Sequence, residues 1–424
     1  MTDPGKPTTV LPASRRPGLF EAFGVEIEMM IVDADTLDVL PACDALMEAV
    51  TGTPTSEAEF GPIAWSNELV LHVLEMKTNG PAPTLSGLHG AFHESVRHAD
   101  EALYALGARL MPGGAHPWMD PARETTLWPH EYTEVYHTFD RIFGCAGHGW
   151  SNLQSTHLNL PFADDGEFAR LHAAIRLVIP LIPALAASSP FLDGRHEGIL
   201  DRRLDAYRRN AARVPSVTGK VVPESVRSEE EYRENVLGRI YRDLAPHDPE
   251  GVLRHEWANA RGAIARFDRG AIEIRVVDAQ ECPRADLAVV AAITSVVRAL
   301  ASGPAAERDV ESDPSTEALA ALLEETIRSG ERAPVEDETL LGVLGYGGSA
   351  SLSAGDVWKD LLHRFPPDDP DREWTDALDA ILGQGPLARR ILRATGTRPD
   401  RDRLRATYRD VTRCLSDNVL YTGG

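Results

Sequence analysis

The chain has 424 residues, with 43 lysines and arginines against 65 aspartates and glutamates, and so a net charge of −22. No block of basic residues interleaves with aromatic ones, which argues against nucleic acid or an anionic membrane surface as a partner. The four cysteines form no CxxC pair, so a zinc ribbon is excluded and reduced, mostly buried thiols are expected.

Two segments of the chain are candidates for a signal or membrane-spanning sequence. Residues 1–17 are rich in Pro and Thr, lack the apolar region of a signal peptide, and are predicted to form a flexible arm. The apolar stretch 175–187 is interrupted by Pro180 and Pro183 and is too short to span a bilayer. We therefore expect a cytoplasmic protein.

The first half of the chain mixes strand and helix patterns. The hydrophobic periodicity predicts strands at 19–32, 66–78, 108–111 and 154–161, and helices at 86–106 and 167–187, the second kinked by Pro180. The segment 115–150 is rich in Trp, His and Tyr without periodicity, and is expected to be an ordered loop region beside a site.

The second half is mostly helical. Six arginines lie within 191–224, namely Arg195, Arg202, Arg203, Arg208, Arg209 and Arg213; they fit either a solvated helix face paired with acids or a phosphate or carboxylate site. A strand at 271–277 and an apolar helix over 287–300 follow. Further helices are predicted at 315–328, 355–364, 374–383 and 401–415.

Three strand segments alternate polar and apolar residues, so that each pair of polar side chains shares one face. The pairs are Glu26/Glu28, His157/Asn159 and Glu273/Arg275. If the strands share a sheet, this face gathers carboxylates, an imidazole and a guanidinium, which suits divalent cations and a phosphate. Taken singly, the pairs also fit a wet sheet face, a satisfied histidine and an intrastrand ion pair.

Glu68 and Glu75 stand in otherwise apolar company, seven residues apart. Their strand parity differs, so one uninterrupted strand cannot place both on the same face, and a bulge or strand end must intervene. Several familiar signatures fail: the sequence has no P-loop, HExxH or Gly-x-Ser-x-Gly motif.

Seven stretches, in order, resemble the second bacterial group of the glutamate–cysteine ligase family, across roughly residues 19–300. They are Gly24–Glu28, Asn67–Thr78, Gly114–Trp118, Ser155–Phe162, Ala187–Arg195, Pro215–Glu224 and Ala271–Gln280. The resemblance implies an α+β fold of glutamine synthetase type: a curved, mainly antiparallel sheet flanked by helices. We expect a catalytic domain over 18–303 and a helical extension over 304–424 packed on it.

The resemblance also implies roles for individual residues. Two or three Mg²⁺ ions would be held by Glu26, Glu28, Glu68, Glu75, His157 and Glu273. Arg275 would steady the transferred γ-phosphoryl group, with Glu273 beside it as a second catalytic residue. Asn159, Arg195 and Arg208 are further candidates for ATP or substrate binding, the last two as a cation site for a substrate carboxylate.

The implied reaction joins a carboxylate to an amine through an acyl phosphate at the expense of ATP, most simply glutamate to cysteine, as in glutathione biosynthesis. Another amine or acid, a non-catalytic nucleotide-binding relative and a guanidino phosphotransferase stay open as alternatives. The expected partners are small-molecule substrates, with a homo-oligomer as the default assembly.

Overall fold

A computed structural model describes residues 16–303, 313–347, 352–369 and 372–423. The arm predicted over residues 1–17 lies almost entirely outside the described residues. The centre of the molecule is an eight-stranded sheet, in the order β2-β3-β4-β1-β6-β8-β7, with β5 pairing the end of β1. Every pairing in it is antiparallel.

Predicted strands are present at β1, β5, β6 and β8, whereas β2 and β7 were not predicted. The strands of the sheet are β1 (Gly24–Asp33), β2 (Glu57–Phe60), β3 (Ile63–Asn67), β4 (Val73–Thr78), β5 (Ala108–Met111), β6 (Ser155–Pro161), β7 (Ala263–Arg266) and β8 (Ala271–Asp278). The predicted strand 66–78 is wrong as one unit, because β3 ends at Asn67 and β4 begins at Val73. This break is the strand end that the parity of Glu68 and Glu75 requires.

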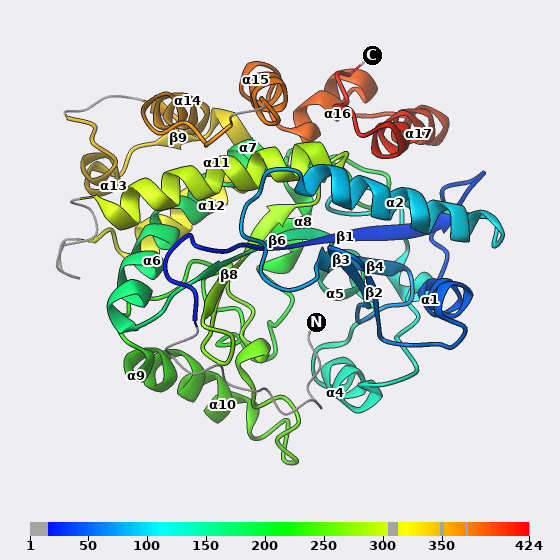
Figure 1. The fold of residues 1–424 in the computed structure, drawn as a ribbon, viewed down its shortest axis with the longest axis horizontal. Helices are drawn as coiled ribbons and strands as arrows, with labels where there is room; N and C mark the ends of the chain where they lie inside the picture. Colours follow the sequence, from blue (N-terminus) through cyan, green and yellow to red (C-terminus); the bar gives the residue numbers. More distant parts are fainter. Residues whose placement is uncertain (1–15, 304–312, 348–351, 370–371, 424) are drawn as a thin grey trace.

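One face of the sheet is covered by three long helices, α2 (Leu88–Tyr104), α6 (Asp165–Val178) and α11 (Pro283–Ser302) (Figure 1). Their apolar residues form one core cluster with the apolar side chains of the strands. Among the described helices, α11 alone is long and apolar enough to cross a membrane, but 78% of its apolar window is buried inside the protein. It is therefore built as a core helix.

The helix predicted over 167–187 is interrupted at the expected place. α6 ends at Val178, a 3₁₀ turn spans Ile179–Leu181, and α7 (Pro183–Ala186) follows. Pro180 lacks the N–H that a continuing α-helix would need, which explains the interruption.

The segment 115–150 is not a loop throughout, contrary to the prediction. It contains α3 (Pro121–Glu124), α4 (Thr133–Phe143) and α5 (His148–Ser151). The second of these buries five of its eleven residues, among them Val135, Phe139 and Ile142, which recur at the spacing of one helix face. The prediction missed this apolar stripe among the aromatic and histidine residues of the segment. Further short helices are α1 (Cys43–Thr51), α8 (Arg202–Tyr207), α9 (Glu229–Tyr232) and α10 (Gly238–Leu244).

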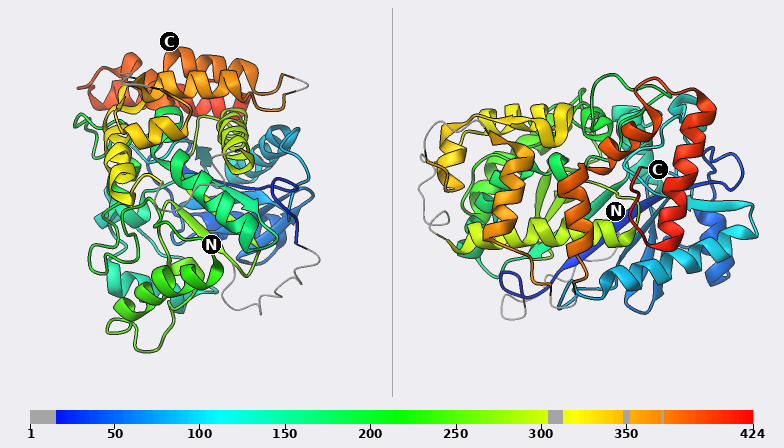
Figure 2. Two further views of the ribbon diagram at one scale, coloured as in Figure 1. Left: turned by 90° about the vertical axis from the view of Figure 1, so that its left-hand side faces the viewer. Right: turned by 90° about the horizontal axis from the view of Figure 1, so that it is seen from above.

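The described residues after 312 contain six helices, α12 (Thr316–Ser329), α13 (Glu338–Val343), α14 (Ala354–Arg364), α15 (Thr375–Gln384), α16 (Leu387–Thr395) and α17 (Arg401–Asp417), with a small β9 (Pro334–Val335) and β10 (Leu352–Ser353) hairpin. α14, α15 and α17 form a further layer over α11 and α2 (Figure 2), whereas α12 packs against the turn 179–181, α7 and α8. The four predicted helices are present, while α13 and α16 were missed. A buried ion pair between Arg390 of α16 and Glu281 ties this layer to the segment after β8.

Candidate active site

The register of the sheet brings the polar pairs of the strands together on its other face. Glu26 of β1 lies opposite His157 of β6, and Glu28 lies opposite Glu75 of β4. Glu273 of β8 lies opposite Asn159 of β6. Because side chains two apart on a strand share a face, the four neighbouring strands β4, β1, β6 and β8 place one cluster of carboxylates around an imidazole.

Glu26, His157 and Glu273 form the first group that could hold a cation. The Nδ1 atom of His157 lies 3.0 Å from Oε2 of Glu26 and 3.8 Å from Oε1 of Glu273. Asn159 donates from Nδ2 to the other oxygen of Glu26 at 3.1 Å. This amide holds the Glu26 carboxylate in place next to the imidazole.

Glu28, Glu75 and the same His157 form the second group. Here the other ring nitrogen, Nε2, lies 4.0 Å from Oε1 of Glu28. Ser155 donates from its N–H to Oε2 of Glu28 at 2.7 Å, and Ser66 donates to Oε1 of Glu75 at 2.6 Å. The two carboxylates are thus fixed by hydroxyl and amide donors while facing each other across the ladder.

Electrostatics show how the cluster is balanced. Burial opposes a charge on the imidazole, yet the hydrogen bond to Glu26 and the charge of Glu28 raise the pKa of His157. Burial also raises the pKa of Glu68 to about 7, helped by the negative charges of Glu75 and Glu28. The site therefore gathers more carboxylate charge than its one imidazole can neutralise.

Glu68 follows directly after β3 and lies outside both groups, although it lines the same cavity as Glu26 and Glu28. Glu75 belongs to the second group and lies opposite Glu28 on the neighbouring strand, but it does not line the cavity. The structure therefore brings together the five glutamates and the histidine that the sequence singled out, and all of them except Glu75 line the cavity.

Guanidinium groups flank the innermost carboxylate. Glu273 lies 3.1 Å from Nη1 of Arg275 and 3.7 Å from Nη1 of Arg266. Arg203 of α8 lines the same wall and donates from Nη2 to the backbone carbonyl of Arg275 at 2.9 Å. These three arginines form the cationic side of the site.

The structure places Arg195 and Arg208, the residues predicted to bind a substrate carboxylate, away from this cavity. Neither residue lines the cavity. Arg195 is exposed in a turn after the Ser-Ser-Pro segment. Arg208 is engaged with Asp205 at 3.0 Å and Glu324 at 2.7 Å. Arg203 of α8 lines the cavity, whereas Arg208, which directly follows this helix, does not.

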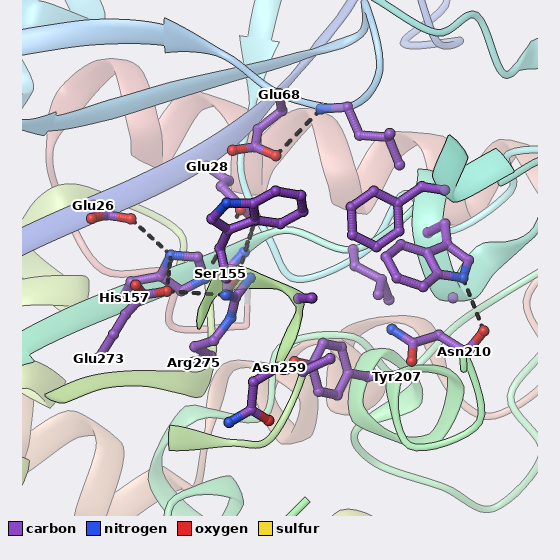
Figure 3. A pocket seen from close by; sticks show the side chains of 18 of the residues that line it. Glu26, Glu28, Glu68, Ser155, His157, Tyr207, Asn210, Asn259, Glu273 and Arg275 are labelled. Atoms are coloured by element: carbon purple, nitrogen blue, oxygen red, sulfur yellow. Dashed lines mark hydrogen bonds and ion pairs between the residues drawn. The ribbon is translucent and has the colours of Figure 1, made fainter. Parts of the chain in front are cut away.

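The cavity has a volume of about 970 Å³ and is open to solvent. The strands contribute Glu26, Glu28, His157, Glu273 and Arg275 to its lining (Figure 3). The segments outside the strands contribute aromatic and apolar side chains, namely Leu69, Phe139, Trp150, Leu153 and Trp257. A pocket with a charged floor and an apolar wall can bind a polyanion and an organic group together.

Sequence reasoning missed several residues of this wall. Arg266 could have been suspected, because it is the one charged residue of the short apolar strand β7. Tyr207 and Asn259 gave no signal, since only the fold brings α8 and the segment before β7 to the cavity. The aromatic content of 115–150 pointed correctly to Trp150.

The donor set fits a divalent cation. Each group offers two carboxylates and one imidazole nitrogen with the ligating atoms within 4.8 Å of one another. Mg²⁺ takes one or two carboxylates plus substrate phosphates, and the oxygen-rich set matches that habit. His157 is common to both groups and turns a different nitrogen to each.

Comparisons with known proteins agree with this architecture. Residues 22–410 match the model of glutamate–cysteine ligase family 2. An uncharacterized protein of Archaeoglobus fulgidus is 32% identical over 401 residues, covering 94% of this chain and 99% of that protein. A Nocardioides protein provisionally named glutamate–cysteine ligase 2-1 is 26% identical over 67% of this chain and 68% of its own length.

Among solved structures, the glutamate–cysteine ligase of Francisella tularensis in complex with AMP is similar in fold. The TM-score is 0.59 at 11% identity, covering 94% of this chain and 88% of that one. The predicted α+β fold, an antiparallel sheet of glutamine synthetase-like type with flanking helices, is confirmed.

Proposed function

The chain belongs to glutamate–cysteine ligase family 2, and from this premise we propose that it is an ATP- and Mg²⁺-dependent carboxylate–amine ligase. We further propose that the acid is glutamate, reacting at its γ-carboxylate, and that the amine is cysteine. The names of its relatives and the AMP complex of its structural neighbour support these choices.

One observation supports the proposal above all: the acid–imidazole cluster around His157 and the row formed by Arg275, Glu273 and Arg266 border one cavity. Cations and guanidinium groups side by side are what a transferred phosphoryl group needs, because charge builds on its oxygens. The chain offers this arrangement on rigid strands, which favours precise positioning.

In the proposed reaction a carboxylate oxygen attacks the γ-phosphorus of ATP, the bond to the β-phosphate oxygen breaks, and ADP leaves. The amine then attacks the carbonyl carbon of the acyl phosphate, phosphate leaves with the bonding electron pair, and the nitrogen loses a proton. Bound Mg²⁺ would neutralise phosphate charge and would be held by Glu26, Glu28, Glu75, His157 and Glu273, with Glu68 at the cavity edge.

The residues of the chain then have separable tasks. Arg275, fixed against Glu273, stabilises negative charge on the moving phosphoryl group. Asn159 and Ser155 orient the carboxylates of Glu26 and Glu28. The apolar wall around Trp150 and Trp257 excludes water, which would otherwise hydrolyse an acyl phosphate.

The test is release of ADP and phosphate by the purified chain with Mg²⁺, ATP, glutamate and cysteine, together with mass detection of the dipeptide. ADP release with a different amine or acid in a substrate screen would keep the chemistry and change the substrates. Nucleotide binding without turnover across the whole screen would contradict the proposal and favour a non-catalytic relative.

A further inference from the structure

A buried hydroxyl without a partner lies in the wall of the cavity. Tyr207, the last residue of α8, is 6% exposed and lines the cavity. Among the described residues, no group hydrogen-bonds its Oη atom. A buried hydroxyl left without a partner is costly, so its position is explained best by a molecule that enters the cavity.

Two guanidinium groups adjoin this hydroxyl. The Cζ atom of Arg203 lies 5.9 Å from the centroid of the Tyr207 ring, and Arg203 reaches the backbone carbonyl of Arg275. The Nε atoms of both arginines are buried and have no hydrogen-bond partner in the described part of the chain. All three groups have a hydrogen to donate, which suits an anion.

The guanidinium group of Arg203 is held in place by a buried carboxylate. Its Nη1 atom lies 3.3 Å from Oδ1 of Asp278, the last residue of β8. The other oxygen of Asp278 accepts from the N–H of Ser188 at 2.9 Å and from the hydroxyl of Ser189 at 2.7 Å. This buried network fixes the guanidinium of Arg203 before any ligand arrives.

We propose that Tyr207 Oη, together with the guanidinium groups of Arg203 and Arg275, binds the substrate carboxylate that becomes phosphorylated. The inference rests on the proposed function and names the subsite of its acid. Phosphoryl transfer requires the attacking oxygen within about 3–3.5 Å of phosphorus, so the carboxylate must lie next to the residue that steadies the phosphoryl group.

The charges of the cavity wall indicate on which side of Arg275 the substrate carboxylate binds. The wall formed by Glu26, Glu28 and Glu68 repels a carboxylate, whereas the wall formed by α8 presents a hydroxyl and a guanidinium. Figure 3 shows the Tyr207 ring on the side of the cavity where Arg275 lies, away from Glu68. The nucleotide phosphates are expected on the acidic side, where cations can bridge them.

The variant Tyr207→Phe tests the subsite without turnover. Calorimetry on the full chain, with Mg²⁺ and a non-hydrolysable ATP analogue present, should show glutamate binding weakened by ~10- to 100-fold, as for loss of a hydrogen bond to a charged group. The affinity for the ATP analogue should stay within about twofold by the same reasoning. The thermal midpoint should not fall, because the deleted hydroxyl has no partner within the described residues.

Tyr408→Phe is the matched control. Tyr408 on α17 is also buried, its hydroxyl also lacks a partner among the described residues, and it does not line the cavity. Its variant should bind glutamate as the wild type does. A third variant, Arg203→Lys, keeps the positive charge but loses the planar set of N–H donors of the guanidinium group. It should weaken glutamate binding more than binding of the ATP analogue.

Equal glutamate affinity in Tyr207→Phe and wild type would overturn the inference. So would weaker binding of the ATP analogue with glutamate binding intact, because that outcome assigns the hydroxyl to a phosphate. Tyr207-dependent glutamate binding without any ADP release would defeat the proposed function and leave the subsite standing. ADP release together with glutamate binding that does not depend on Tyr207 would support the proposed function and overturn the subsite.

Discussion

The two faces of the central sheet are built from the same strands and behave differently. On the cavity face, β1, β6 and β8 present carboxylates, an imidazole and a guanidinium. On the other face the same strands present apolar side chains, among them Val25, Ile27, Leu158, Ile272 and Ile274, packed under α2, α6 and α11. Strict alternation thus separates chemistry from stability.

The apolar face also contains a buried carboxyl group, Asp286, which shows what makes a polar group functional. Thr156 donates to Oδ1 of Asp286, at the start of α11, at 2.5 Å, and the N–H of Gln280 donates to the same oxygen at 2.9 Å. Asp286 is buried under a helix, whereas Glu26 and Glu28 line a cavity. A polar residue serves the fold or a ligand according to what lies opposite it.

The largest effect is expected from the centre of the cavity face. Glu273→Gln and Arg275→Ala should each lower the rate of ADP release by at least ~100-fold, in line with loss of one electrostatic group at a reacting centre. The measurement is steady-state turnover, with circular dichroism to check the fold. Unchanged turnover in both variants would show that this face is not the reacting surface.

Cation binding can be separated from turnover on the same face. MgCl₂ should raise the thermal midpoint of the wild type, because a ligand present at 100 times its Kd stabilises the folded state by about 2.7 kcal/mol. Glu28→Gln should lose most of this rise and should be no less stable without Mg²⁺, since it removes repulsion between Glu28 and Glu75 across the ladder.

The control for that experiment is Glu324→Gln, which changes an exposed acid of α12 outside the cavity. Its Mg²⁺ response should match that of the wild type. An equal Mg²⁺ response in Glu28→Gln and wild type would remove Glu28 from the cation site.

The apolar face should respond to pH through stability. Burial raises the pKa of Asp286 from 3.8 to about 7. Between these values the folded state holds a proton that the unfolded state has lost, so wild-type stability falls as pH rises through this window. The stability of Asp286→Asn has no such dependence on pH, because asparagine does not titrate. Its thermal midpoint should therefore rise relative to that of the wild type between about pH 4 and pH 7. Parallel curves for the two proteins would contradict the assignment.

The smallest effect is expected outside both faces. Arg195→Ala and Arg208→Ala should change turnover by less than ~3-fold, because an exposed ion pair contributes about 0–1 kcal/mol. Kinetics over a range of glutamate and ATP concentrations will show whether either KM moves. A tenfold rise in the KM for glutamate in either variant would reinstate that arginine as part of the acid site.

Local periodicity was enough to predict the strands β1, β6 and β8 and the residues on them that share a face. Glu26/Glu28, His157/Asn159 and Glu273/Arg275 could be paired from spacing alone, since side chains two apart on a strand point the same way. The resemblance to a ligase family added Glu68 and Glu75, whose parity a single strand could not explain. The break between β3 and β4 resolves that conflict.

The far wall of the cavity could not be predicted from spacing. α4 and α5 carry Phe139 and Trp150 to the site, but the spacing of residues within a helix does not show against which part of the sheet the helix will pack. Among the arginines of 191–224, composition could not distinguish Arg203 from Arg208. The choice depends on which side of a six-residue helix faces the sheet.

By itself, the sequence determined the alternation of each strand, and so which acids, histidine and arginine would share a surface, because the pleat of a strand is a local property of the backbone. Only the tertiary structure decided that these surfaces meet around His157, that Tyr207 and Arg203 join them, and that Arg195 and Arg208 do not. Those outcomes depend on strand register and helix packing, which are fixed by contacts between residues far apart in the chain.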